Sequence, residues 1–196
     1  MAAQPAKGKA VRSRGQPRPA GMAACPAETA RARPGATPDL TEPSTLPPPL
    51  IAVLNGPNIN MLGMREPEKY GSTTIEELER LCADAAEELG LAVDFRQTNS
   101  EGELVTWVQE CRGRCAGIIM NPAGYTTNSI ATMDALLAVD LPTIEVHITN
   151  IHRREEFRHH SFISKAATGV IAGLGVQGYV LALRAMAGLV DAEQDA

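Results

Sequence analysis

The sequence LIAVLNGPN, residues 50–58, indicates the fold class, because an unbroken apolar run ends abruptly at turn-forming residues. Such a run is typical of a parallel β-strand that is buried on both faces. From Asn55 the chain continues as NGPNINMLGMREPEKYG (55–71), which contains three asparagines, three glycines and two prolines. Most connections are about 4 to 6 residues long, and much longer ones are usually functional or disordered. We therefore expect a buried strand followed by a functional loop that carries Arg65 and Tyr70.

The alternation of strand and helix continues along the rest of the chain. Short β-rich runs predict further strands at 91–95, 117–120, 143–147 and 168–174. Apolar periodicity predicts helices at 75–89, around 104–108 and 130–137, and in a last segment that ends near Val190. Thr74 and Glu77 have the spacing of a capping box at the start of the first helix. Five strands alternating with helices predict an α/β fold with a flavodoxin-like, doubly wound, five-stranded parallel sheet.

The N-terminal quarter of the chain differs sharply in composition from the rest. Residues 1–50 hold ten of the fourteen prolines and no aromatic residue. Such a segment buries too little apolar surface to offset its ordering entropy, so 1–49 is predicted to be a disordered Pro/Ala-rich tail. A single catalytic domain is expected over 50–196. The first residues share the basic, acid-poor composition of a transit peptide but lack its leucines and aromatics, and a translation start at Met22 is another explanation for part of the tail.

Charge and cysteine content exclude several classes of protein. Residues 1–50 carry +4 of a total net charge of −5, so the remainder carries about −9, which argues against a nucleic-acid-binding surface. No apolar run has the length of a membrane span. Cys111 and Cys115 lie four apart in a predicted helix and have no second Cys or His pair, so no metal site is expected. We expect reduced thiols and a cytoplasmic location.

Polar residues follow the predicted strands at one edge of the sheet, where ligands bind in folds of this class. They are Asn55, Asn58, Asn99, Asn121 and His147. These five side chains therefore mark the edge at which chemistry is expected.

His147 is the strongest candidate for proton transfer. It ends a predicted strand, and Glu145 lies two residues earlier, on the same face of that strand. A lone histidine here would often be a satisfied surface residue. Its position at the ligand-binding edge and the nearby carboxylate favour a role as an acid or base near neutral pH.

Two further motifs each leave an alternative open. In IHRREEFRHHS (151–161), Arg154 and Arg158 lie four apart, as on one face of a helix, and they indicate either an anion-facing turn or a solvated surface. GLGVQG (173–178) matches a dinucleotide-binding pattern, but no further strand with an acidic residue follows it. Tight packing of the last helix is the simpler explanation for its glycines, and no cofactor is expected.

Covalent catalysis has little support in the sequence. There is no GxSxG motif, and the four lysines lie in the tail, in the loop at 55–71 and at Lys165 after the charged segment. Acid–base chemistry without a Schiff base is therefore expected.

Four segments together resemble type II 3-dehydroquinate dehydratases across residues 51 to about 190. They are NGPNINMLGMREPEKYG (55–71), NPAGYTTNS (121–129), IEVHITNIHRREEFRHHS (144–161) and ATGVIAGLGVQGY (167–179). The resemblance implies a flavodoxin-like hydro-lyase of the shikimate and quinate pathways. It implies that 3-dehydroquinate loses water by anti elimination through an enolate, without a metal or organic cofactor.

The resemblance also implies roles for individual residues. Tyr70 would be the base, assisted by Arg65, and His147 the general acid, oriented by Glu145. Asn58 would help to hold the enolate. Substrate-binding positions would be Asn121, Thr127, Asp134, Ile148, Thr149, Arg158 and, in the same basic segment, Arg154. Family members assemble from trimers into dodecamers, with the Asp134 position entering a neighbour's site, so a homo-oligomer is implied.

Thr127 and Met133 depart from the family pattern, which usually has a histidine and an arginine at these positions. The proton-transfer residues are retained, but the recognition of substrate hydroxyls is expected to change. A dehydratase for a related cyclic hydroxyketone therefore stays open as a second hypothesis. A non-catalytic flavodoxin-like binding or assembly protein and a nucleotide-binding module are two further alternatives.

Overall fold

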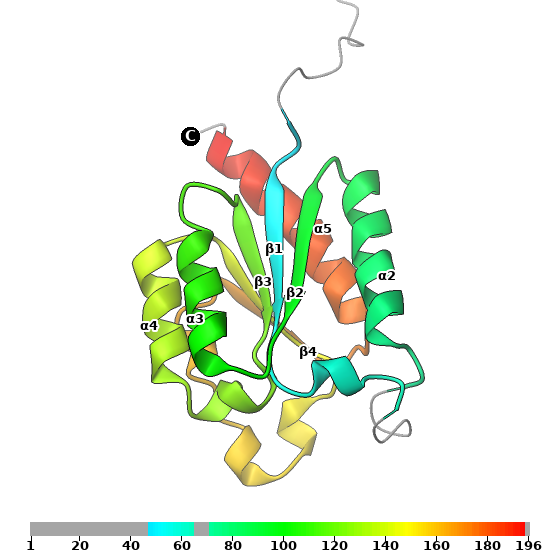
Figure 1. Cartoon of the computed structure of the whole chain (residues 1–196), viewed down its shortest axis with the longest axis vertical. Helices are drawn as coiled ribbons and strands as arrows, with labels where there is room; N and C mark the ends of the chain where they lie inside the picture. The colour runs from blue at the N-terminus through cyan, green and yellow to red at the C-terminus, as the bar shows by residue number, and fades with distance from the viewer. Residues whose placement is uncertain (1–46, 65–70, 195–196) are drawn as a thin grey trace, which may run out of the picture. The chain divides into compact units, whose positions relative to one another are not determined.

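A five-stranded parallel sheet forms the centre of the structure, a computed structural model that describes residues 47–64 and 71–194 (Figure 1). Its strands in chain order are β1 (Leu50–Asn55), β2 (Ala92–Gln97), β3 (Gly117–Asn121), β4 (Thr143–His147) and β5 (Gly169–Ala172). They lie side by side in the order β2-β1-β3-β4-β5, and every neighbouring pair is parallel. This is the flavodoxin-like strand order, so the predicted fold class is confirmed.

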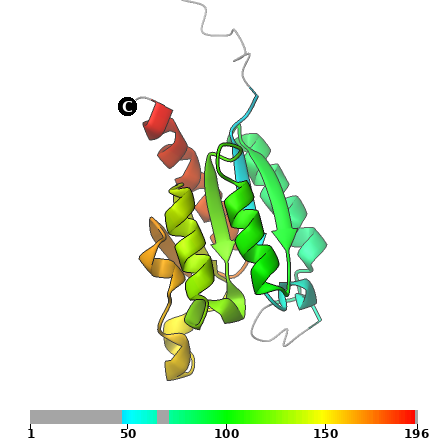
Figure 2. The same ribbon diagram turned by 60° about the vertical axis from the view of Figure 1, so that its left-hand side comes forward.

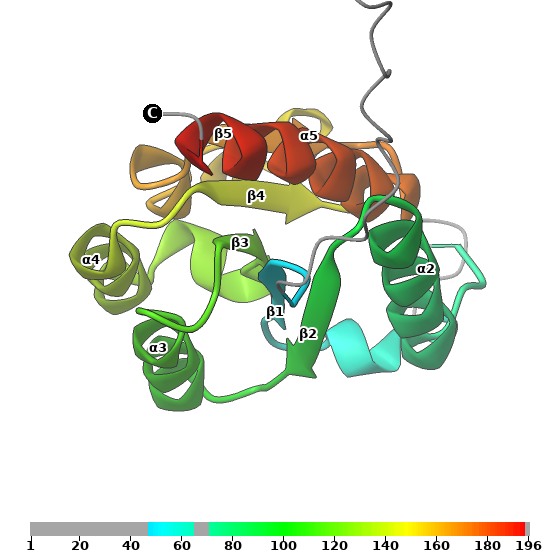
Figure 3. The ribbon, with the colours of Figure 1, turned by 90° about the horizontal axis from the view of Figure 1, so that it is seen from above.

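Helices cover both faces of the sheet, as Figures 2 and 3 show. Helices α2 (Ile75–Glu88) and α5 (Gln177–Gln194) pack on one face, and α3 (Glu101–Glu110) and α4 (Ile130–Val139) on the other. In β1, Ile51 and Val53 enter the core beneath α2 and α5, while Ala52 and Leu54 enter the core beneath α3 and α4. Residues 51–55 are all buried, which explains the unbroken apolar run before Asn55.

Side-chain caps set the starts of three helices. The capping box before α2 is present: the Thr74 amide donates to Glu77 Oε2 at 2.8 Å, and the Glu77 amide donates to Thr74 Oγ1 at 3.3 Å. Ser100 caps α3 and Ser129 caps α4 in the usual way, by accepting from an amide three residues later.

Two predicted details are wrong. Helix α3 ends at Glu110, so Cys111 is its C-cap and Cys115 lies beyond the helix. Arg154 and Arg158 do not share a helical face, because the segment forms separate short 3₁₀ helices, η3 (Ile151–Arg153), η4 (Glu156–Arg158) and η5 (Ile163–Lys165). The extended backbone of Arg154, at φ −105° and ψ −166°, separates the first two.

The predicted N-terminal tail, 1–49, lies almost wholly outside the described residues and stays a prediction. None of the helices in the described part of the chain combines the length and the apolar composition of a membrane span.

A buried tyrosine on α5 joins the ends of β1 and β3. The Tyr179 hydroxyl donates to Asn55 Oδ1 at 2.7 Å and accepts from Asn121 Nδ2 at 2.8 Å. Burial raises the pKa of this hydroxyl well above its ordinary value, so it remains a neutral donor. Tyr179 therefore ties the last helix to the two central strands at the edge where ligands are expected.

Tyr179→Phe should destabilise the protein by about 1–3 kcal/mol, because Asn55 Oδ1 and Asn121 Nδ2, both buried, each lose the hydroxyl as a hydrogen-bond partner. Tyr125→Phe is the matched control, since its hydroxyl donates to the Asn99 carbonyl in an exposed position, where the loss should be smaller. Chemical unfolding measures both changes. Equal losses in the two variants would contradict the structural importance of the buried bridge.

Candidate active site

The turns after β1 and β3 lie against one another at the switch point of the sheet. The Gly56 amide donates to the Asn121 carbonyl at 2.8 Å. A Cβ atom at Gly56 would lie 2.5 Å from the Pro122 carbonyl oxygen, so only glycine allows this approach. Next to this contact, Asn58 and Ala123 have positive φ angles of 68° and 50°. Left-handed backbone at non-glycine residues is uncommon and tends to occur at functional sites.

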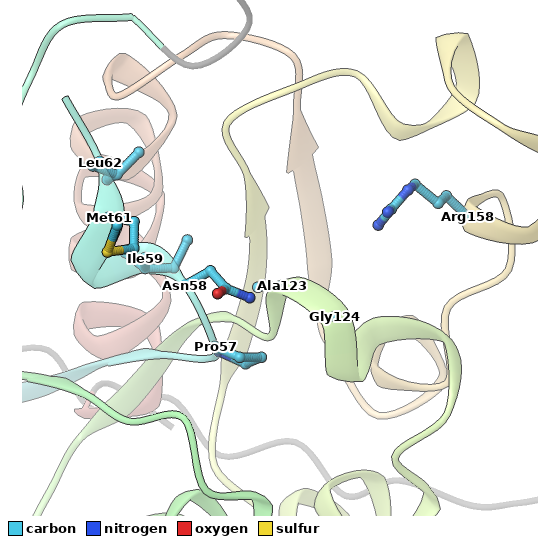
Figure 4. A pocket seen from close by; sticks show the side chains of 8 residues that line it. All are labelled: Pro57, Asn58, Ile59, Met61, Leu62, Ala123, Gly124 and Arg158. Carbon is cyan, nitrogen blue, oxygen red and sulfur yellow. The ribbon is translucent and has the colours of Figure 1, made fainter. Parts of the chain in front are cut away.

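Two adjoining cavities open beside these turns. The larger has a volume of about 170 Å³, and Figure 4 shows its lining: Pro57, Asn58, Ile59, Met61, Leu62, Ala123, Gly124 and Arg158. The smaller, of about 60 Å³, is lined by Ala123, Thr126, Thr127, His147, Thr149, Ile151, Arg154 and Arg158. Ala123 and Arg158 belong to both linings, so the two cavities are adjacent, and together they are called the recess below.

His147 and Glu145 form a hydrogen-bonded pair at the end of β4. The distance between His147 Nε2 and Glu145 Oε1 is 2.8 Å, and the two side chains are 6% and 0% exposed. As residues two apart on one strand, they lie on the same face of β4. The contact between Glu145 and His147 that the sequence predicts is therefore present in the structure.

Two serine hydroxyls complete the surroundings of the Glu145 carboxylate. Ser161 Oγ donates to Oε1 at 2.8 Å, and Ser164 Oγ donates to Oε2 at 2.5 Å. Burial by itself raises the pKa of this carboxyl, but the hydrogen bonds from His147, Ser164 and Ser161 outweigh it, and the pKa lies below its usual value. Glu145 is therefore an anion, and its Oε1 accepts a hydrogen bond from the Nε2–H group of His147.

Two arginines, Arg154 and Arg158, supply positive charge to the recess. Arg158 lines both cavities, its Nε donates to Glu155 Oε2 at 3.0 Å, and its guanidinium lies 5.1 Å from the centre of the Phe157 ring. Arg154 lines the smaller cavity beside His147, with its Nε 3.5 Å from the same Glu155 oxygen. The recess therefore combines the histidine of an acid–base pair with two arginines, an arrangement suited to an anionic ligand.

The remaining predicted residues fall into four groups. Thr127 and Thr149 line the smaller cavity with His147. Ile148 is buried and, with Thr149, borders a neighbouring open depression of about 800 Å³. Asn121 and Asp134 line neither cavity: Asn121 is bonded to Tyr179 and to the Ala123 amide, and Asp134 lies on the exposed side of α4. Arg65 and Tyr70 lie outside the described residues.

Ser161, Ser164 and Tyr179 were not predicted from the sequence. Ser161 and Ser164 have the three-residue spacing of a local hydroxyl cap, and the Ser164 amide does donate to Ser161 Oγ. Nothing in that spacing connects them to Glu145, which lies 16 and 19 residues earlier in the chain. Within residues 47–64 and 71–194, no three His, Cys, Asp or Glu side chains are grouped so that they could hold a metal ion.

Comparison with known proteins shows the family. The family model described as dehydroquinase class II matches residues 49–187, which is most of the chain. The chain belongs to the class II dehydroquinase family. The prediction of a hydro-lyase of this family is therefore confirmed.

Individual relatives of this class II dehydroquinase chain match over nearly their whole length. A Pseudomonas putida protein named 3-dehydroquinate dehydratase 2 is 57% identical over 142 residues, covering 72% of this chain and 95% of that protein. A 3-dehydroquinate dehydratase from Streptomyces avermitilis is also 57% identical, covering 72% and 89%. The crystal structure of type II dehydroquinase from Propionibacterium acnes has 47% identity and a TM-score of 0.69, covering 71% of this chain and 96% of that one.

The charge on Glu145 predicts a pH dependence of stability. A carboxyl whose pKa is lower in the folded state stabilises the fold above its unfolded pKa, and that contribution is lost as the pH falls toward the folded pKa. The unfolding free energy of the wild type should therefore fall more steeply below about pH 4.5 than that of Glu145→Gln. Denaturant unfolding between pH 3 and 7 measures the difference.

Glu88→Gln, on the exposed side of α2, is the control and should follow the wild type through this range. Parallel curves for the wild type and Glu145→Gln would show that Glu145 is not preferentially ionised in the folded protein.

Proposed function

We propose that this protein removes water from 3-dehydroquinate to form 3-dehydroshikimate, in the shikimate or quinate pathway. The observation that carries the proposal is the buried Glu145–His147 pair, 2.8 Å apart, whose histidine lines a recess that Asn58 and Arg158 also line. Family membership supports the reaction, and the names of the relatives specify it. The substrate is a small anion, which matches a recess bordered by two arginines.

Tyr70 is the proposed base, with Arg65 favouring its anionic form. Free tyrosine has a pKa of about 10, and lowering it by about 3 units corresponds to about 4 kcal/mol of preferential stabilisation of the anion. A neighbouring guanidinium in a water-poor site is a physically adequate source. Gly71, which follows Tyr70 in the chain, borders the open depression beside Thr149 and Arg154, and this supports placing the base next to the recess.

The proposed reaction proceeds in two steps. Tyr70 takes the proton from C2 of 3-dehydroquinate, and the electron pair moves to the carbonyl oxygen to form an enolate, which Asn58 helps to hold. The enolate then re-forms the ketone, the bond from C1 to its hydroxyl breaks with anti geometry, and His147 protonates the hydroxyl, which leaves as water. Because Nε2 faces Glu145, Nδ1 is the nitrogen that serves the leaving group.

The rest of the proposed site binds the substrate. The backbone and hydroxyl around Ile148 and Thr149, together with Arg154 and Arg158, serve its carboxylate and hydroxyls. For Asn121 we propose an indirect role through the turn that it anchors at Ala123.

Thr127 supports a second candidate function, the dehydration of a related cyclic hydroxyketone. It borders the cavity beside His147, where the resemblance implies a histidine that contacts substrate hydroxyls. Threonine is shorter and uncharged, so the space and the donor available to a hydroxyl both change.

Purified protein mixed with 3-dehydroquinate should produce the ultraviolet absorbance of a conjugated enone. Tyr70→Phe should lower kcat by about 10²- to 10⁴-fold, the usual contribution of a positioned acid or base, whereas the matched control Tyr125→Phe should retain activity. Borohydride added with substrate should not inactivate the enzyme, because no Schiff base forms.

Full activity of Tyr70→Phe would reject the proposed base. Turnover by Thr127→His but not by the wild type would reject 3-dehydroquinate as the native substrate and favour the second candidate.

We also propose a cytoplasmic homo-oligomer built from trimers, up to a dodecamer. The supporting observation is the outer face of α4, where Ile130 and Leu137 are 52% and 55% exposed on either side of Asp134. A helix with apolar side chains on all sides is usually buried, so this face fits a second copy of the chain. Asp134 would then enter a neighbour's site.

Leu137→Arg should reduce the assembly to smaller species in sedimentation velocity, because it places a charge in an apolar contact. Activity should fall with it if Asp134 serves a neighbouring site. Gln109→Arg, with the same added charge on the exposed side of α3, is the control and should leave the assembly intact. A wild type that sediments at its chain mass of 20.8 kDa would contradict the proposal.

A further inference from the structure

The segment that follows the basic 3₁₀ helices lies directly over the end of β4. The Phe162 amide donates to the Thr126 carbonyl at 2.9 Å, which attaches the segment to the wall of the smaller cavity. Ile163 is fully buried in the core beneath α3 and α4. Ser161 and Ser164 flank this anchor, so their hydroxyls are presented to β4 by a fixed piece of backbone.

The two hydroxyls donate hydrogen bonds to both carboxylate oxygens of Glu145. Ser161 Oγ donates to Oε1, the oxygen that also accepts from His147, and Ser164 Oγ donates to Oε2. Ser161 Oγ accepts the Ser164 amide at 3.0 Å, which leaves its single proton free to point at the carboxylate. Every hydroxyl proton in the group is therefore directed at Glu145, and the carboxylate acts only as an acceptor.

We propose that Ser161 and Ser164 are positioning residues that hold the Glu145 carboxylate as an acceptor for His147 Nε2–H, so that Nδ1 is the nitrogen that gives a proton to the substrate. This inference rests on the proposed function for the role of His147. Without the hydroxyls, a buried carboxylate has too few donors to remain charged, and it takes up a proton. A protonated Glu145 donates to Nε2, and the single proton of the neutral imidazole then resides on Nδ1.

The two serines should affect catalysis by deciding which protonated form of His147 acts as the acid, and they should not change the shape of the recess. With the proton of the neutral ring on Nε2, Nδ1 is free to take up a proton and to deliver it to a departing hydroxyl. With the ring in the other tautomer, Nδ1–H belongs to a neutral imidazole, a much weaker acid than imidazolium. Removing the serines should therefore lower kcat and leave KM nearly unchanged.

The test measures the histidine tautomer without substrate. Full-length protein labelled with [¹⁵N]histidine is examined by magic-angle-spinning NMR, which does not depend on the size of an assembly, and His147 is assigned from a His147→Gln sample. The neutral wild-type ring should show a protonated Nε2 and an unprotonated Nδ1. Ser164→Ala and Ser161→Ala/Ser164→Ala should show a growing fraction of Nδ1–H.

The kinetic arm uses matched variants. Ser164→Ala should lower kcat on 3-dehydroquinate by about 10- to 100-fold, as the loss of an outer-shell partner commonly does, with KM within about twofold. Ser164→Thr keeps the hydroxyl and should restore both the tautomer and the rate. Ser100→Ala removes a serine hydroxyl that only caps α3, so it should change stability without changing the tautomer.

An unchanged His147 tautomer in Ser164→Ala would overturn the inference, whatever the effect on rate. If the double variant does not fold, Ser164→Ala alone decides, because Ser164 does not cap a helix in the way that Ser100 does. A tautomer change together with a wild type that does not dehydrate 3-dehydroquinate would support the positioning role and reject the proposed function.

Discussion

A carboxylate with no exposure to solvent sets the main requirement at this end of the sheet. Glu145 belongs to β4, an inner strand of the sheet, where a charge is costly unless hydrogen-bond donors surround it. One donor, His147, comes from the same strand, but the other two come from a segment 16 and 19 residues later. The irregular segment from Ile148 to Ser164 contains only short 3₁₀ helices, but its C-terminal end is held in place by these hydrogen bonds to Glu145.

The parallel sheet imposes a second requirement, because it brings every strand-to-helix turn to the same edge. The turns after β1 and β3 meet at Gly56 and Pro122, and both continue through left-handed residues, Asn58 and Ala123. Their conformations would be costly alone, about 1–3 kcal/mol each. The hydrogen bonds from the Asn58 amide to Asn99 Oδ1 and from the Ala123 amide to Asn121 Oδ1 help to offset that cost. The recess is thus bordered by backbone that packing holds in place.

The sequence was most informative where the signal is local. Runs such as LIAVLN (50–55) and the capping residues Thr74 and Glu77 depend on neighbours within a few positions, and the structure contains both features. The same holds for His147 with Glu145, two residues apart on one strand. Signals of this kind place the elements and the edge at which the site lies.

Contacts between distant parts of the chain were not predictable in this way. Asn121 is at the expected edge, but its amide is bonded to Tyr179, 58 residues later. Ser161 and Ser164 look like part of a solvated, charged turn until the fold places them over Glu145. Arg154 and Arg158 share a cavity although they share no helical face. In each case packing, which no short window of sequence encodes, decides what a side chain touches.

The bridge made by Tyr179 also has a consequence for the order of events during translation. The residues that line the recess are complete once Arg158 has been synthesised, but the hydroxyl that joins Asn55 to Asn121 is 124 residues after Asn55. A nascent chain emerges from the ribosome N-terminus first, at about 5–20 residues per second. The ends of β1 and β3 are therefore fixed only after α5 has been synthesised. The nascent protein should become catalytically active late, when α5 leaves the ribosome.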